Sequence, residues 1–203
     1  MLAGGAARRY GGRPKGLIEL GGQRILDRVV DAIAGVTGAA PLLVANAPEG
    51  PTWRPDLQTV PDVRPDCGSL GGIYTAVVSG VGPVLCVAWD MPFVTAELLR
   101  ALVEGSAGWD AFLPESDPHG LPTGRGRHGV EPLCAVYGPA CGPAIERQLD
   151  RGDLRAIGFH ADVQVGTLPL ERVRACGDPE ELFLNVNTPE DLQRAEVVWR
   201  RRG

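Results

Sequence analysis

Short apolar runs recur along the first half of the chain. Pro41–Ala45 and Pro83–Ala88 are uniformly apolar, and Gln58–Val60 is a weaker third run. A run without apolar–polar alternation is typical of a strand buried on both faces of a parallel sheet. We therefore predict strands at these three places, with Pro83–Ala88 near the middle of the sheet.

Apolar residues at helical spacing separate these runs. In residues 24–34, Ile25, Val29 and Ile33 fall on one helical face. Thr95 and Thr188 are suited to cap helices, and Thr188 opens a capping box with Pro at the first helical position. We predict further helices at 70–78, 95–104 and 139–149 and from 189 onward, and strands at 133–137 and within 153–165. Strands alternating with helices predict a single α/β domain with a doubly wound, mostly parallel sheet.

A polar residue follows each of the three strand predictions. Asn46 follows the first, Asp62 follows the second after one proline, and Asp90 follows the third. Ligands of doubly wound sheets bind beyond the carboxyl ends of the strands, so these side chains are candidates for one site. A turn or helix-cap role is the alternative for each of them. Asp90 is the strongest candidate, because its carboxylate could hold Mg²⁺ beside a substrate phosphate.

The segment Leu2–Gly22 is rich in glycine and carries four cationic side chains, three of them arginines. Gly4 and Gly5 allow a phosphate to approach the backbone closely, and guanidinium groups such as that of Arg9 bind phosphate oxygens. Lys15 is the only lysine in the chain, which suggests a point-charge role on a phosphate. The pattern is neither a Walker A loop nor a G-x-G-x-x-G fingerprint. A solvated basic loop is the alternative interpretation.

Composition narrows the class of protein. The net charge is −5 and the pI about 5.2, so the chain lacks the basic footprint of a nucleic-acid-binding protein. The five cysteines form no C-x-x-C pair and are odd in number, which favours free thiols in a reducing cytoplasm. No apolar run is long enough to span a membrane. We expect a cytoplasmic protein without membrane or nucleic-acid partners.

Two later segments contain further candidate residues. Residues 116–131 form a long loop rich in glycine, proline and arginine, in which Arg125 and Arg127 could bind an anionic acceptor; a solvated loop is the alternative. Asn185 and Asn187 flank a single valine before the last helix. The capping box at Thr188 does not account for these two asparagines.

Several sequence blocks, taken together, resemble the molybdenum cofactor guanylyltransferases, the MobA family of nucleotidyltransferases. In order they are LAGGAARRYGGRPKGLIEL, the strand end at Asp62, CGSLGGI, WDMPF, EPLCAVY and FLNVNTPEDL. The resemblance implies a Rossmann-like fold of the nucleotide-diphospho-sugar transferase type. It also implies a nucleotide-binding part at about residues 1–110 and an acceptor-binding part at about residues 111–203.

The same resemblance implies an activity and its residues. GMP would pass from GTP to the phosphate of molybdenum-bearing molybdopterin, with Mg²⁺ as cofactor and pyrophosphate as the second product. The implied nucleotide-binding residues are Leu2, Ala3, Gly4, Gly5, Lys15, Asn46, Asp62 and Asp90. Lys15, Arg9 and Asp90 would be catalytic, Asp90 would bind the metal, and Arg125, Arg127, Asn185 and Asn187 would face the acceptor. Other cofactor-biosynthesis proteins and target molybdoenzymes are implied partners.

Three alternatives remain open at this stage. The nucleotide could be CTP, the acceptor could be another phosphorylated molecule, or the protein could bind a nucleotide without catalysing transfer. A separate expectation concerns the first residues. In the family an internal strand precedes the L-A-G-G motif, whereas only Met1 and Leu2 precede Ala3 here. We therefore expect a natural start upstream of Met1.

Overall fold

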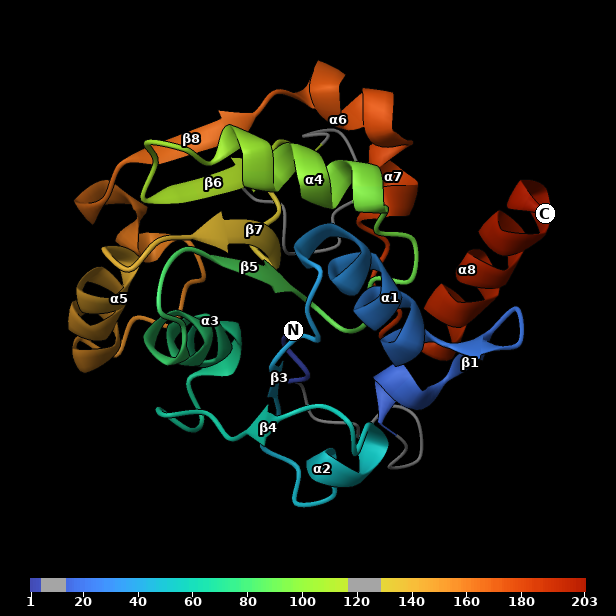
Figure 1. Ribbon diagram of the computed structural model, residues 1–203, viewed down its shortest axis with the longest axis horizontal. Helices are drawn as coiled ribbons and strands as arrows, with labels where there is room; N and C mark the ends of the chain where they lie inside the picture. Colours follow the sequence, from blue (N-terminus) through green and yellow to red (C-terminus); the bar gives the residue numbers. More distant parts are fainter. Residues whose placement is uncertain (5–13, 117–128) are drawn as a thin grey trace.

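A computed structural model of the chain describes residues 1–4, 14–116 and 129–203. Figure 1 shows a central sheet with helices packed around it and the N-terminus near the middle of the molecule. The strands are β1 (Glu19–Leu20), β2 (Gln23–Arg24), β3 (Leu43–Val44), β4 (Thr59–Val60), β5 (Val84–Val87), β6 (Ala111–Pro114), β7 (Cys134–Tyr137) and β8 (Val165–Leu168).

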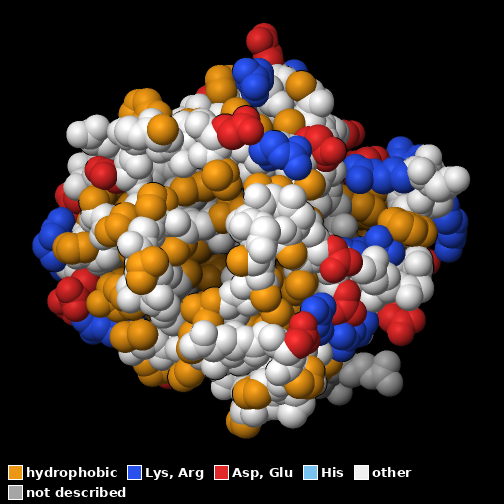
Figure 2. All heavy atoms as spheres, in the orientation of Figure 1, with side chains coloured by type: hydrophobic (Ala, Val, Ile, Leu, Met, Phe, Trp, Pro, Cys, Tyr) orange, Lys and Arg blue, Asp and Glu red, His pale blue; other side chains and the backbone are white. Residues whose placement is uncertain are grey.

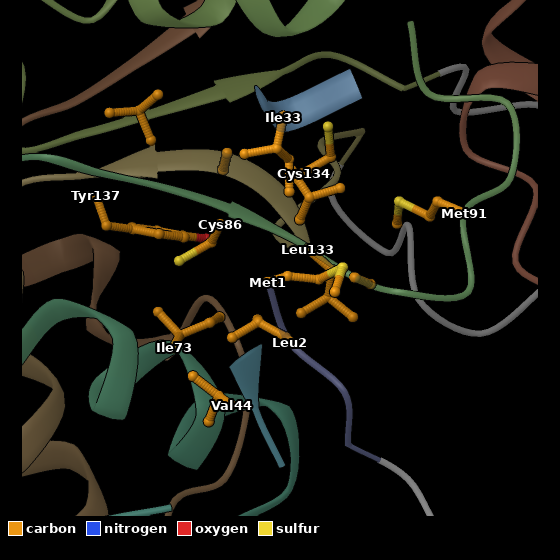
Figure 3. Close-up of a cluster of buried hydrophobic side chains, with 14 of the residues drawn as sticks. Met1, Leu2, Ile33, Val44, Ile73, Cys86, Met91, Leu133, Cys134 and Tyr137 are labelled. Carbon is orange, nitrogen blue, oxygen red and sulfur yellow. The ribbon is translucent and has the colours of Figure 1, made fainter. Parts of the chain in front are cut away.

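The helices alternate with these strands, as expected for an α/β fold. They are α1 (Ile25–Thr37), α2 (Gly50–Trp53), α3 (Gly68–Ser79), α4 (Ala96–Gly105), α5 (Cys141–Asp150), α6 (Leu170–Cys176), α7 (Pro179–Leu182) and α8 (Pro189–Arg202), with 3₁₀ turns η2 (Lys15–Leu17) and η3 (Gly158–Asp162). Helices α1 and α4 pack together, as do α3 and α5. Ile33 of α1 and Ile73 of α3 lie on opposite sides of β5 (Figure 3), so the sheet is covered on both faces.

The central sheet is mixed, with one strand reversed. β3 pairs with β4 in parallel, while β5, β7, β6 and β8 form a second hydrogen-bonded group in that order. In that group β7 runs antiparallel to both β5 and β6, whereas β6 and β8 are parallel. The prediction of a mostly parallel, doubly wound α/β sheet is confirmed, and β7 is its reversed strand.

Met1–Ala3 joins these two groups of strands. The Leu2 N–H donates to the Val87 carbonyl and the Ala3 N–H to the Val44 carbonyl, each at 2.8 Å. Leu2 thus forms parallel bridges to both β3 and β5. Figure 3 shows the Leu2 side chain between Val44 and Ile73, deep in the apolar core. These residues occupy the central strand position, and the natural start of the chain upstream of Met1 stays a prediction.

The amino group of Met1 also lies inside the protein. It donates to the Leu42 carbonyl at 2.7 Å, and burial lowers its pKa below the ordinary value for an N-terminal amine. Burial disfavours the charged form of any group that loses its hydration. The start of this chain therefore packs in the core beside β3 and β5.

A second, smaller core holds the C-terminal helix against the hairpin β1–β2. Its buried members are Leu20, Ile25, Phe93, Leu184, Val186, Ala195 and Val198. Trp199 of α8 packs against Gly21 at the hairpin turn, and the Arg28 guanidinium lies 4.0 Å from the centre of the Trp199 ring. Figure 1 shows α8 and this hairpin side by side at one edge of the molecule.

Most element predictions are confirmed, and the exceptions are short. The helix caps at Thr95 and Thr188 form as expected, and Thr188 completes a reciprocal capping box with Asp191. The apolar face predicted for residues 24–34 is the buried face of α1. The sequence did not predict β6, the hairpin β1–β2 or helices α2, α6 and α7. Within 153–165 the helical part is the turn η3, and the strand begins only at Val165.

Candidate functional site

A cavity of about 930 Å³ opens at the edge of the sheet where β3, β4 and β5 end. Such an edge is where doubly wound proteins bind their ligands. The cavity is lined by Leu2, Gly4, Lys15, Val44, Asn46, Asp62, Asp66, Gly68, Ser69, Gly72, Ala88, Asp90, Val130, Glu131, Pro132, Leu133, Arg155, Ala156 and Ile157. It therefore gathers Lys15 and all three polar strand-end residues that the sequence predicted.

Lys15 lies in the turn η2 and is only 7% exposed. Its Nζ donates to Oδ1 of Asn187 at 2.5 Å, so the lone lysine contacts one of the two predicted asparagines. The next residue, Gly16, lies flat against the Trp89 ring, and a Cβ at Gly16 would fall 2.3 Å from Trp89 Cε3. Trp89 stacks in turn on Trp53, with ring centroids 4.8 Å apart. Two stacked indole rings thus determine where the lysine can lie.

Asp90 comes three residues after the end of β5 and is 4% exposed. Its backbone carbonyl accepts the Val186 N–H at 2.9 Å. That bond holds the Asn185–Asn187 segment against the end of β5, although the two are far apart in the sequence. Asp90 and Lys15 both line the cavity, and Asn187 lies behind Lys15 as its hydrogen-bond partner.

Asn46 and Asp62 form a reciprocal pair at the ends of β3 and β4. The Asn46 amide Nδ2 donates to Asp62 Oδ2, and the Asp62 N–H donates to Asn46 Oδ1, both at 2.7 Å. Burial raises the pKa of Asp62 above its ordinary value, although hydrogen bonds from the side chains of Asn46 and Thr75 act in the opposite direction. The pair presents a partly desolvated acceptor to the cavity, suited to the N–H groups of a ligand.

The other predicted site residues differ in where they lie relative to the cavity. Asn185 does not line the cavity: its amide Nδ2 donates to the Phe183 carbonyl at 3.0 Å. Leu2 and Gly4 line the cavity, and the backbone of Ala3 is bound to β3. The predictions at Gly5, Arg9, Arg125 and Arg127 lie outside the described residues.

The structure adds three charged cavity residues that sequence reasoning missed, namely Asp66, Glu131 and Arg155. Glu131 precedes β7 and is only 5% exposed, and its Oε1 accepts the Leu133 N–H at 2.9 Å. Arg155 follows α5, and its guanidinium is paired with Asp153, with Nη2 2.6 Å from Oδ2. Glu131 and Arg155 stand next to apolar stretches, and an acid directly before the run Leu133–Tyr137 was the available signal for Glu131.

Within residues 1–4, 14–116 and 129–203, no group of three or more His, Cys, Asp or Glu side chains could enclose a metal ion. No helix in those ranges is both long and apolar enough to cross a bilayer. All five cysteines are free thiols; three of them are buried, and Cys67 and Cys176 are half-buried. Figure 2 shows acidic and basic side chains intermixed over one face of the molecule.

Comparisons with known proteins show the family to which the chain is related. A family model described as a MobA-like NTP transferase domain matches residues 1–164. The chain is 36% identical to a probable molybdenum cofactor guanylyltransferase of Pelotomaculum thermopropionicum, over 98% of this chain and 91% of that protein. It is 33% identical to the molybdenum cofactor guanylyltransferase of Desulfosudis oleivorans, over 98% of this chain and 93% of that protein.

Solved structures show the same architecture. Molybdopterin-guanine dinucleotide biosynthesis protein A from Archaeoglobus fulgidus superimposes with a TM-score of 0.79 and 29% identity, covering 98% of this chain and 97% of that one. A 4-diphosphocytidyl-2C-methyl-D-erythritol synthase from Anaerococcus prevotii gives 0.71 at 14% identity, over 98% and 94% of the two chains. At 14% identity, the similarity to the Anaerococcus prevotii enzyme shows only that the two proteins share a fold.

Proposed function

This chain belongs to the family of MobA-like NTP transferase domains, and on that premise we propose that it transfers GMP from GTP to the phosphate of molybdenum-bearing molybdopterin. The products are the molybdopterin guanine dinucleotide cofactor and pyrophosphate. The observation that carries the proposal is the meeting of Lys15, Asp90 and the Asn46–Asp62 pair around one cavity at the sheet edge. Lys15 and Asp90 suit the phosphate chain of a nucleotide in the middle of the cavity. The Asn46–Asp62 pair suits its base at one end.

The reaction forms one P–O bond to the α-phosphorus of GTP and breaks another. An oxygen of the acceptor phosphate attacks the α-phosphorus of GTP, and the bond from that phosphorus to the α–β bridging oxygen breaks. Pyrophosphate leaves with the bonding electrons. The nucleophile is already an anion, so the step requires no general base, which fits a cavity whose described lining contains no histidine or cysteine.

Lys15 acts on the negative charge of the phosphates. Its ammonium is buried at the cavity wall and oriented by the Asn187 oxygen. A fixed positive charge beside the leaving pyrophosphate stabilises charge that develops in the transition state. Gly4 lets the backbone approach the same phosphates, and nothing lies within 4 Å of its Cβ position. Gly5 and Arg9 complete this loop in the proposal.

Asp90 would hold the Mg²⁺ ion of the reaction. Mg²⁺ usually binds through one or two protein carboxylates together with substrate phosphates and water, so a nearly buried carboxylate without a larger acidic cage among the described residues fits it. When bound, the ion would neutralise phosphate charge. The carboxylate itself is positioned by the backbone of β5 and the Val186 contact.

The remaining assignments follow the two sides of the cavity. Asn46 and Asp62 would bind the guanine nucleotide, in the nucleotide-binding part at about residues 1–110. Asn187 would orient Lys15 and face the acceptor, and Arg125 and Arg127 would also face it, in the part at about residues 111–203. Asn185 would instead hold the chain before Asn187 through its bond to the Phe183 carbonyl. We place the reaction in the cytoplasm, where the five free thiols would stay reduced, and include cofactor-biosynthesis proteins and target molybdoenzymes among the partners.

A pyrophosphate-release assay tests the proposal. GTP, CTP and ATP are each supplied with Mg²⁺, with and without molybdopterin. We expect release with GTP only when the acceptor is present. Release with CTP instead would identify the cytidylyl alternative. Nucleotide binding without any release, also in the presence of other phosphorylated pterins, would identify a non-catalytic binding protein.

A further inference from the structure

Two segments from the second half of the chain line the cavity. One lies directly before β7, and the other, residues 155–157, follows α5. Among the described lining residues beyond residue 111, Arg155 is the one cationic side chain. The acceptor of the proposed reaction carries a phosphate, and a guanidinium group suits a phosphate well. What holds residues 155–157 in place therefore bears on the binding of the acceptor.

Gln148, near the end of α5, holds this segment from below. Its side chain is completely buried, and its Nε2 donates to the Asp153 carbonyl at 3.1 Å and to the Arg155 carbonyl at 2.7 Å. The Asp153 N–H donates back to the Gln148 carbonyl at 3.2 Å. A buried amide is costly unless it is hydrogen-bonded, and this amide forms its bonds with the segment that leads to the cavity. One residue of α5 thus fixes the backbone at two positions of the segment.

The segment also packs closely around the Gln148 amide. The Gly158 N–H donates to the Arg155 carbonyl at 3.1 Å, which closes a turn over the amide. A Cβ at Gly158 would lie only 2.5 Å from Gln148 Nε2. Since interiors leave no room for such an approach, any larger residue at Gly158 would push the amide away from its two carbonyls.

The Arg155 guanidinium is directed by Asp153. Arg155 Nη2 lies 2.6 Å from Asp153 Oδ2, and Arg155 Nε lies 2.9 Å from Asp153 Oδ1. The Arg155 side chain is 77% exposed in this pair, and an exposed ion pair contributes little stability of its own. The backbone of both partners, however, is bonded to the buried Gln148. The place of this positive charge at the cavity therefore depends on Gln148.

We infer that Gln148 is a positioning residue for the acceptor: it holds the backbone at Asp153 and Arg155 so that the Arg155 guanidinium meets the acceptor phosphate. This inference rests on the proposed function for the identity of the acceptor. Gln148 is not a lining residue of the cavity, so it acts only through the segment that it holds. The Asn46–Asp62 pair, which would bind the nucleotide, lies on other strands. Loss of the Gln148 bonds should consequently affect the acceptor and spare GTP.

Gln148→Met tests this separation. Methionine has nearly the same size and helix propensity as glutamine but donates no hydrogen bond. Binding of molybdopterin and of GTP to the full chain is measured separately by titration calorimetry, without turnover. We expect molybdopterin to bind about tenfold more weakly, as for the loss of one or two hydrogen bonds, and GTP to bind as in the parent. In turnover assays the KM for the acceptor should rise while kcat and the KM for GTP stay unchanged.

Gln193→Met, the same change at an exposed position of α8, is the matched control and should leave both affinities unchanged. A double-mutant cycle with Arg155→Met then shows whether Gln148 acts through Arg155. Arg155→Met alone should weaken molybdopterin binding at least as much as Gln148→Met does, because it removes the charge itself. In that background Gln148→Met should have little further effect. Gly158→Ala disturbs the same contact from the other side and should also weaken molybdopterin binding.

The possible results separate the inference from the proposed function. Unchanged molybdopterin binding in Gln148→Met, or additive losses in the cycle, would overturn the inference. An equal loss of GTP affinity would overturn it too, because Gln148 would then support the whole cavity. If Gln148→Met did not fold, Gly158→Ala with and without Arg155→Met would decide. Selective loss of molybdopterin binding, in a protein that releases no pyrophosphate, would refute the proposed function and leave the Gln148 assignment standing. A parent that binds no molybdopterin would overturn both.

Discussion

Asp62, which is proposed to bind the nucleotide, carries a cost in stability at neutral pH. Burial raises its pKa, so the folded protein holds the Asp62 proton more tightly than the unfolded chain does. The stability that this group contributes is present in acid and is lost as the pH rises through the raised pKa. At neutral pH the ionised carboxylate is therefore a cost to the fold, retained because it accepts hydrogen bonds.

Asp62→Asn should separate these two effects. The amide cannot accept from both donors of guanine, so we expect the KM for GTP to rise about tenfold while the melting temperature stays equal or increases. In the parent, the KM for GTP should also rise as the pH falls through the raised pKa of Asp62, and the variant should lose this dependence. Asp31→Asn on the exposed face of α1 is the control. A lowered melting temperature with an unchanged KM would contradict this view of Asp62.

Gly16 is a second residue of interest, because a neighbouring side chain leaves no room there for any residue larger than glycine. A Cβ there would meet the Trp89 ring at 2.3 Å, and that ring is buried and stacked on Trp53. Gly16→Ala should destabilise the fold by about 1–3 kcal/mol, the usual cost of overpacking, and should reduce kcat by displacing Lys15. Gly35→Ala, in open space on α1, should be neutral or stabilising in the same melting and turnover assays. Equal behaviour of the two variants would refute the contact argument.

The polar residues after the apolar runs were predictable, and Glu131 was not. Asn46, Asp62 and Asp90 end apolar runs, and in a parallel sheet such residues meet at one edge. Glu131 precedes its run, and it reaches the same edge only because β7 is reversed. Strand direction depends on tertiary pairing, which the local sequence does not encode. Lys15 was found from its scarcity, but its contact with Asn187 joins segments at opposite ends of the chain.

Among the elements, the hairpin β1–β2 and helix α8 work as a pair. The hairpin follows Lys15, and α8 follows Asn187, so their shared apolar core fixes the two partners of one hydrogen bond. Gly21 and Gly22 form the two-residue turn, both at positive φ, and a Cβ at Gly21 would meet Trp199 at 2.2 Å. Docking of α8 on the hairpin would therefore position Lys15, the lysine proposed to act on the phosphates, from a distance.

Gly21→Ala and Gly22→Ala test this coupling as a matched pair. Both substitutions strain a left-handed turn, but only the first also displaces Trp199, since nothing lies within 4 Å of the Gly22 Cβ position. We expect a lower melting temperature in both variants and a markedly greater loss of kcat in Gly21→Ala. If kcat falls equally in the two, the contact between α8 and the hairpin has no part in placing Lys15.

Long periodic segments were easier to predict than short ones. Helices α1, α3, α4, α5 and α8 have enough turns to show a period, and two of them carry recognisable threonine caps. The two-residue strands of the hairpin are too short for any period, although a Gly-Gly pair between them is a hairpin signal. β6 has only four residues and all of them are buried, so its sequence shows no apolar–polar alternation that would mark it as a strand.

At the scale of the whole molecule, one sheet edge gathers the residues proposed to bind the two substrates. Four strand positions run in parallel and end there, and the reversed β7 adds its first residues to the same edge. Met1–Ala3 lies in the middle of this row and directly precedes Gly4 at the cavity. The nucleotide and the acceptor can therefore approach from opposite sides toward Lys15 and Asp90.

The fate of the α-phosphorus of GTP tests this account most directly. GTP labelled at the α-phosphate and GTP labelled at the γ-phosphate are incubated separately with molybdopterin, Mg²⁺, and either the parent or Asp90→Asn. The account predicts α-label in the pterin dinucleotide, γ-label only in pyrophosphate, and loss of both products in Asp90→Asn with the fold intact. Transfer of the γ-label to the pterin, or turnover of Asp90→Asn within a few fold of the parent, would contradict it.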